Sequence, residues 1–173
     1  MLNFLLGRWP NLVVKRKGGV LSSTSRIISL KGWSWLENLF VDEYVYIGPN
    51  ARLYSYGGIT ISKGVIAGPN LTIYTSNHDF YSLDTVPYSN EGVSGKKVEI
   101  GVGCWLGDSV MLMPGTVLGA HCLVGAGSIL RGSFPEGSII NGNPAKVVKS
   151  IPPELLKQKN IMANNDNFYM RIK

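Results

Sequence analysis

The sequence predicts an all-β chain wound into a parallel β-helix of hexapeptide repeats, with a protruding loop and a short C-terminal helix. Three observations predict this fold. Every sixth residue from Ile100 is aliphatic, which gives the series Leu106, Leu112, Leu118, Val124 and Leu130. Four positions after each aliphatic residue stands a small or β-branched one, except that Phe134 ends this second series. Glycine follows four of the aliphatic residues, at Gly101, Gly107, Gly119 and Gly125.

A period of six matches neither the alternation of a single strand nor the 3.6-residue spacing of a helix. It is typical of a β-helix, in which short extended segments stack on one another. Glycines bend the chain between segments because they accept backbone angles that other residues avoid. Stacked segments lie ~4.8 Å apart, and their aliphatic residues point inward, since stacked repeats bury a continuous core.

Composition agrees with one compact repeat domain. The 173 residues are 45% hydrophobic and 16% charged and include 21 glycines, which excludes a disordered or collagen-like chain. The formal net charge of +6 suits an anionic partner. Lys and Arg are scattered, however, and no nucleic-acid-binding motif is present, so we expect a phosphorylated cofactor and no nucleic acid.

The chain divides into five parts within a single domain, residues 1–173. Residues 1–35 lack a clean repeat and are expected to form an N-terminal cap or first turns. Their Trp9, Trp33 and Trp35 are expected to pack at the end of the coil, or alternatively to form a surface for a lipid-linked or polymeric acceptor. Residues 36–76 carry the six-residue register, with a slip of two residues at 56–58, through Val41, Ile47, Leu53, Ile61, Ala67 and Ile73.

A long insertion interrupts the register. The aliphatic residue expected at position 79 comes only at Ile100, and residues 77–97 between the coils are rich in Asn, Ser, Gly and Pro. Such a segment predicts a protruding surface loop, and a long loop in an otherwise terse repeat is usually functional. The coils then run over residues 98–134. Residues 135–173 are expected to leave the repeat. A short helix is expected to start at Pro152 and Pro153 and to run to about Ala163, with a tail after it.

Two features concern the compartment. Cys104 and Cys122 are eighteen residues apart, so they should lie one above the other in the coil; we expect reduced core residues, a disulfide being the alternative. Residues 1–6 are apolar but too short for a secretory signal, and no stretch reaches membrane-spanning length. The expectation is a cytoplasmic protein without stable membrane insertion.

The sequence resembles the hexapeptide-repeat acyltransferases, in the branch of galactoside, maltose and xenobiotic acetyltransferases and nearest to the colanic-acid and capsule polysaccharide O-acetyltransferases. The resemblance covers about residues 41–151. It rests on Thr75-Ser76-Asn77-His78, Val98-Glu99-Ile100-Gly101, Trp105-Leu106-Gly107, Pro114-Gly115-Thr116-Val117-Leu118-Gly119, Val124-Gly125-Ala126-Gly127-Ser128 and Asn141-Gly142-Asn143-Pro144-Ala145-Lys146-Val147-Val148. It implies a left-handed β-helix of triangular section, a homotrimer with active sites between subunits, and acetyl-CoA as cosubstrate.

Acetyl transfer to a hydroxyl needs a base, and histidine suits that role because its pKa lies near neutrality. His78 matches the catalytic histidine of the family, whereas His121 is expected to be a solvent-exposed turn residue. Asp79, Asp84 and Glu91 are candidates to orient the His78 imidazole, and the sequence does not choose among them. Asn77, Asp79 and Trp105 are expected to contact the acceptor.

The resemblance also implies the cofactor contacts. The pantetheine arm of coenzyme A is expected near Trp105, Gly107, Asp108 and Ala126, and Lys146 and Lys149 match positions that meet the nucleotide phosphates. A lysine of the galactoside branch is replaced here by Gly132, with Arg131 adjacent as a further expected contact. No metal is expected.

The predicted function is an acetyl-CoA-dependent O-acetyltransferase acting on a sugar hydroxyl, in surface polysaccharide biosynthesis. The alternatives are an N-acetyltransferase of an amino sugar or an antibiotic O-acetyltransferase, because the same base and cleft serve either nucleophile. A non-catalytic scaffold and a γ-type carbonic anhydrase are more remote, since the latter needs three histidines on zinc and the chain has two.

Overall fold

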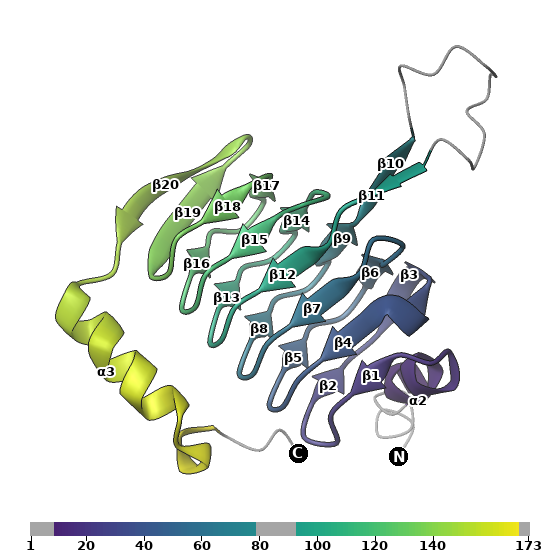
Figure 1. Ribbon diagram of the computed structural model, residues 1–173, viewed down its shortest axis with the longest axis horizontal. Helices are drawn as coiled ribbons and strands as arrows, with labels where there is room; N and C mark the ends of the chain where they lie inside the picture. The colour runs from purple at the N-terminus through teal and green to yellow at the C-terminus, as the bar shows by residue number, and fades with distance from the viewer. Residues whose placement is uncertain (1–8, 79–92, 170–173) are drawn as a thin grey trace.

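The computed structural model describes residues 9–78 and 93–169, and it shows a parallel β-helix with three flat faces (Figure 1). Each full turn of the coil contributes one strand to each face. The faces are called sheets A, B and C, in the order in which the chain enters them. The predicted all-β fold, with its protruding segment and its C-terminal helix, is confirmed.

The strands of each sheet follow one another along the coil axis. Sheet A holds β1 (Val20–Leu21), β4 (Leu39–Val41), β7 (Ile59–Ile61), β12 (Val98–Ile100), β15 (Val117–Leu118) and β18 (Ser133–Phe134). Sheet B holds β2 (Arg26–Ile27), β5 (Tyr46–Ile47), β8 (Ile66–Ala67), β13 (Trp105–Leu106), β16 (Leu123–Val124), β19 (Ser138–Gly142) and β20 (Ala145–Ser150). Sheet C holds β3 (Leu30–Ser34), β6 (Ala51–Tyr54), β9 (Thr72–Tyr74), β14 (Met111–Leu112) and β17 (Ile129–Leu130).

The interior is lined by the residues that the six-residue register selects. In sheet A, Val41 pairs with Ile61, Ile61 with Ile100, and Ile100 with Leu118, and all four side chains are buried. The matching positions of sheets B and C are also buried, as are the small residues at the corners, such as Cys104 and Val110. The stack therefore forms one continuous apolar core.

The insertion leaves the coil at one corner and returns to the same turn. β7 pairs directly with β12, so the insertion between them in sequence does not interrupt the strand pairing of sheet A. The insertion begins and ends as an antiparallel pair, β10 (Ser76–His78) and β11 (Val93–Gly95), which projects away from the coil (Figure 1). The corner between sheets C and A is thus the root of this hairpin.

A helix covers the N-terminal end of the coil. The stacked turns begin at β1, well before the register that is visible in the sequence from Val41. Helix α2 (Trp9–Arg16) lies across this first turn with Pro10 and Val14 buried, and the Asn11 side chain bonds the backbone at Ser25 and Ile27. A short 3-10 turn, η1 (Leu36–Asn38), follows β3.

The coil extends further than the sequence predicted. The expectation that the repeat ends at Phe134 is wrong, because β18 pairs with β15, β19 pairs with β16, and Ile140 is fully buried. The corner before β18 is two residues shorter than its counterpart in the turn below. Phe134 therefore takes an inward strand position above Leu118, which shifts the register. β20 then returns antiparallel to β19 through a cis Asn143–Pro144 bond.

The C-terminal segment runs back along the corner between sheets A and B. Helix α3 (Pro153–Ala163) agrees with the predicted helix, and the 3-10 turn η3 (Asp166–Phe168) follows it. The segment reaches from the last turns of the coil to the early ones (Figure 1). Leu156 packs near Gly137 at the start of this path, and Tyr169 covers Gly64 at its end.

Candidate functional site

The proposed base lies at the end of the first hairpin strand. His78 is the last residue of β10 and faces Val93 of β11, while Asn77 faces Ser94. Both His78 and Asn77 are exposed, and the hairpin carries them outward from the corner between sheets C and A. Asp79, Asp84 and Glu91, the residues expected to orient the imidazole or contact the acceptor, lie outside the described residues.

The root of the hairpin is fixed by hydrogen bonds between the Thr75 side chain and the backbone of the turn below. The Thr75 hydroxyl donates to the Tyr54 carbonyl oxygen at 2.8 Å and accepts from the Gly57 N–H at 2.8 Å. The Lys96 N–H donates to the Thr75 carbonyl oxygen at 2.7 Å, which closes the two ends of the insertion on each other. The hairpin therefore leaves a rigid corner, and its direction is set where it starts.

Trp105 stands on a different face. It points outward from β13 of sheet B and is 56% exposed. Its neighbours above and below in the same column are Ile66 and Leu123, and this column continues to Tyr46 and Ile139. The outer side of sheet B thus carries a row of apolar side chains, in place of the polar residues usual on a solvent-facing sheet.

Gly107, Asp108 and Ala126 gather at the corner between sheets B and C. The Gly107 N–H donates to the Val124 carbonyl oxygen, and a Cβ at Gly107 would lie 2.8 Å from the Ala126 nitrogen, so two successive turns approach closely here. The next turn leaves Ala126 and Gly127 exposed, with open space beside Gly127. This edge of the coil is therefore exposed to solvent at Ala126 and Gly127.

A polar ladder follows the same corner. The Asn70 amide donates to Asp108 Oδ1 at 3.3 Å, and the Asn50 amide reaches Asn70 Oδ1 at 3.5 Å. Hydrogen bonds from the Ser109 hydroxyl and the Asn70 amide lower the pKa of Asp108, so the carboxylate stays ionised. Neither Asn50 nor Asn70 was among the site residues predicted from the sequence. The repeated Gly-Pro-Asn triplets at 48–50 and 68–70 are the signal that identifies them.

The basic residues expected to meet the cofactor are divided between two places. Lys146 and Lys149 are exposed on β20, which extends sheet B at its C-terminal end. Arg131 is exposed at the corner between sheets C and A, after β17, and so lies on the hairpin corner.

One chain therefore brings the expected residues together in two groups, not one. Asn77, His78 and Arg131 belong to the corner between sheets C and A. Trp105, Gly107, Asp108 and Ala126, with the two lysines, belong to sheet B and its corner with sheet C. The width of sheet C separates the two groups within a chain.

His121 is not the solvent-exposed turn residue that the sequence predicted. It adopts a left-handed backbone conformation (φ 57°) and is only 7% exposed, with its ring over Gly103. Burial, and next the positive charge of Lys159, lower the pKa of His121; Asn160 and Glu136 act in the opposite direction. Its Nε2 finds no hydrogen-bond partner among the described residues. Helix α3, whose position the repeat pattern does not indicate, covers this corner.

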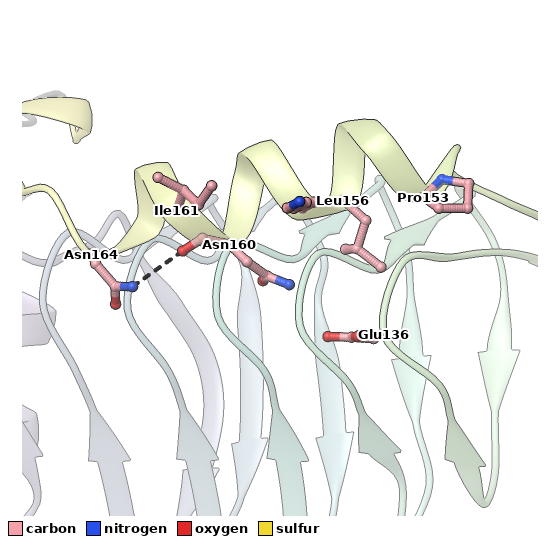
Figure 2. A pocket seen from close by; sticks show the side chains of 7 residues that line it. Glu136, Pro153, Leu156, Asn160, Ile161 and Asn164 are labelled. Atoms are coloured by element: carbon pink, nitrogen blue, oxygen red, sulfur yellow. Dashed lines mark hydrogen bonds between the residues drawn. The ribbon is translucent and has the colours of Figure 1, made fainter.

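A cavity of about 450 Å³ lies between α3 and the coil. Figure 2 shows Leu156 and Asn160 reaching from the helix toward the corner that carries Glu136. The Asn164 amide donates to the Asn160 carbonyl oxygen at 3.3 Å and closes one end of the helix. None of the expected site residues lines this cavity, which keeps it apart from the candidate site.

The two cysteines occupy the stacked core positions that the repeat predicts. Both are buried and free, and each sulfur bonds a backbone carbonyl oxygen of the turn above, Cys104 to Gly119 and Cys122 to Pro135, at 3.1 Å. The hydrogen bond with Cys122, together with burial, raises the pKa of Cys104. Its thiol is therefore protonated and unreactive.

A candidate metal site and a membrane-spanning helix are both absent from residues 9–78 and 93–169. No cluster of three or more His, Cys, Asp or Glu side chains gathers there in a way that could hold a metal ion. In the same ranges, no helix has the length and apolar character needed to cross a bilayer.

The curated relatives that the chain matches are named as acetyltransferases. The chain is 34% identical over 119 residues to the putative lipopolysaccharide biosynthesis O-acetyl transferase WbbJ of Escherichia coli, a match that covers 65% of this chain and 58% of that protein. It is 26% identical over 145 residues to the putative colanic acid biosynthesis acetyltransferase WcaF of the same species, covering 84% and 76%. The chain thus spans less than two thirds of WbbJ. No protein-family model matches it.

Solved structures agree on the fold. A hexapeptide-repeat-containing acetyltransferase from Vibrio cholerae, complexed with acetyl coenzyme A, superposes with a TM-score of 0.68 at 23% identity. The match covers 82% of this chain and 76% of that one. The expected resemblance is confirmed: the chain has the hexapeptide-repeat fold and is related in sequence to acetyltransferases that are named for polysaccharide synthesis.

Proposed function

We propose, from this relationship to the hexapeptide-repeat acetyltransferases, that the chain transfers an acetyl group from acetyl-CoA to a sugar hydroxyl during surface polysaccharide synthesis. The observation that carries the proposal is the hairpin that presents His78 at a rigid corner of the coil. The names of WbbJ and WcaF support a polysaccharide precursor as the acceptor class. We place the reaction in the cytoplasm, where acetyl-CoA is available.

His78 acts as the general base in this proposal. Its imidazole takes the proton of the acceptor hydroxyl as the hydroxyl oxygen attacks the thioester carbonyl carbon. The new C–O bond forms, the C–S bond breaks, and the proton held on His78 passes to the departing thiolate. Backbone N–H groups of the coil corners are candidates to hold the transient oxyanion.

In this proposal, acetyl-CoA binds along sheet B and its corner with sheet C. The apolar row around Trp105 and the open edge at Gly107 and Ala126 suit an extended pantetheine arm, and Lys146 and Lys149 supply cations for the phosphates. Because one chain holds base and donor edge apart, we propose that the site forms between copies, in a homotrimer. Each base then faces the donor edge of a neighbour.

Thiol release from acetyl-CoA in the presence of nucleotide sugars and oligosaccharides tests the proposal. His78→Ala is expected to lower turnover by at least about 100-fold, the usual range for loss of a general base. Ser94→Ala, on the facing strand, is the matched control and is expected to keep turnover within about twofold. Unchanged turnover in a correctly folded His78→Ala protein would refute the mechanism.

A further inference from the structure

The N-terminal end of the coil carries exposed aromatic and basic side chains together. Its exposed members are Trp9, Leu12, Lys15 and Arg16 on α2, Lys17 after it, and Lys31, Trp33 and Trp35 on and after β3. We call this set the end surface. Three of the four tryptophans of the chain belong to it.

Helix α2 has two distinct sides. Pro10 and Val14 are buried against the first turn of the coil. Trp9 and Leu12, which are 57% and 54% exposed, share the opposite side with Arg16, because positions three and seven residues apart lie on one face of a helix. The helix therefore covers the coil with one side and presents a tryptophan, a leucine and a cation with the other.

The strand at this end, β3, also carries exposed basic and aromatic side chains. β3 is the edge strand of sheet C, and its Lys31 and Trp33 are exposed. The Lys17 ammonium lies 5.6 Å from the centre of the Trp33 ring, so the helix and the strand meet at a cation–aromatic contact. One acidic residue, Glu37, lies beside Gly18 at this end. The end surface itself carries four positive charges, on Lys15, Arg16, Lys17 and Lys31.

This combination matches one kind of partner, an anionic lipid bilayer. Tryptophan rings settle at the boundary between headgroups and acyl chains, and cations beside them are attracted to anionic headgroups. A short amphipathic helix that lies in the plane of the bilayer uses both. We propose that the end surface docks this protein on the surface of an anionic membrane, with the coil axis pointing away from it.

Such docking would fix the distance of the hairpin from the membrane surface. β3, β6 and β9 are successive strands of sheet C, and β9 leads into the strand that carries His78. Two strand spacings place the root of the hairpin ~10 Å above the end surface. An acceptor sugar on a lipid carrier would then stand beside the base. This consequence rests on the proposed function, whereas the docking does not.

Vesicle sedimentation with the 173-residue chain tests the docking. We expect binding to vesicles of about three parts phosphatidylcholine and one part phosphatidylglycerol, weak binding to phosphatidylcholine alone, and a roughly tenfold loss in high salt. The variant with Lys15→Glu, Arg16→Glu and Lys17→Glu is expected to bind at least about tenfold more weakly. Trp9→Ser with Leu12→Ser is expected to reduce binding as well. Lys157→Glu, an exposed cation on α3, is the matched control and should bind like the parent.

Three results would overturn the inference. Equal binding to both kinds of vesicle would remove the role of the cations. Unchanged binding by folded end-surface variants, verified by thermal unfolding, would remove the surface itself, and Arg16→Glu alone serves where the triple variant does not fold. A change of oligomeric state in light scattering, without loss of lipid binding, would make the surface an interface between copies. Acetyl transfer plays no part in these measurements, so they leave the proposed function to its own test.

Discussion

The ring of Tyr169 stacks on the ring of Tyr44, with centroids 5.2 Å apart and planes 8° from parallel. The Lys63 ammonium lies 5.0 Å from the Tyr169 ring centre and bridges Glu43 and Asp166. The hydrogen bond with Asp166 is the main reason that the pKa of Lys63 is raised, so its charge is retained at neutral pH. The C-terminal segment is thereby fastened to an early turn of the coil.

Tyr169→Ala should loosen this fastening. We expect a loss of about 1–2 kcal/mol in the free energy of unfolding, because the aromatic stack and its packing over Gly64 disappear. Urea unfolding measures the change. Tyr169→Phe, which keeps the stack but lacks the hydroxyl that donates to Ala163, should lose less than half as much. Equal losses in the two variants would assign the effect to the hydroxyl.

His121 should make stability depend on pH below neutrality. Burial, and next the charge of Lys159, hold the pKa of His121 below 6.5 in the folded protein. The unfolded chain therefore binds a proton more readily, and the free energy of unfolding should fall as the pH drops through 6.5 toward the folded pKa. Above that window the histidine is neutral in both states and contributes no pH dependence.

The comparison variant is His121→Gln, which has a similar polar side chain and no titration in this range. Chemical unfolding at pH 7.5 and 5.5 gives two differences, one for each protein, and their subtraction removes the other titrating groups. The parent should lose more stability than the variant between these pH values. A parent that loses the same amount as His121→Gln would show that the ring is not held neutral.

Replacing Gly101 or Gly127 by alanine should destabilise the protein for different reasons. A Cβ at Gly101 would lie 2.6 Å from the Gly119 carbonyl carbon, against backbone that has no room to yield. Gly127 has open space around it but a φ of +71°. We expect Gly101→Ala to cost more than about 2 kcal/mol, and Gly127→Ala about 1–2 kcal/mol from backbone strain alone. Thermal unfolding of both variants tests this order, and the reverse order would contradict it.

The interior could be predicted from sequence because burial in this fold repeats with the chain. Each inward residue lies directly above one in the turn below, so a period of six identifies Ile100, Leu112 and Leu130 without any knowledge of tertiary contacts. The same logic failed at Phe134 and Ile140, where a shorter corner shifts the register by two residues. A pattern that depends on fixed corner lengths does not detect such a change.

The repeat pattern could not predict what packs against the outside of the coil corners. His121 occupies a turn position that faces outward in a bare coil, and only α3, which returns from the far end, buries it. Residue types and motif identified His78 and Ala126 as site candidates. Their placement on different corners follows from counting strands around the coil, which needs the structure.

Mixing two inactive variants should restore part of the activity. His78→Ala removes the proposed base, and Ala126→Tyr places a bulky ring on the exposed donor edge without entering the core. If each site takes its base from one chain and its donor edge from the next, random mixed assemblies contain about one intact site in four. Refolding the two variants together at equal amounts should therefore recover about a quarter of the parental rate.

Each variant refolded alone provides the baseline, and light scattering verifies that all samples have the same oligomeric state. Recovery near a quarter requires the two residues to act across an interface, because no single chain in the mixture carries both intact. Activity no higher than the mean of the two baselines would instead place base and donor edge within one chain. That outcome would contradict the shared site.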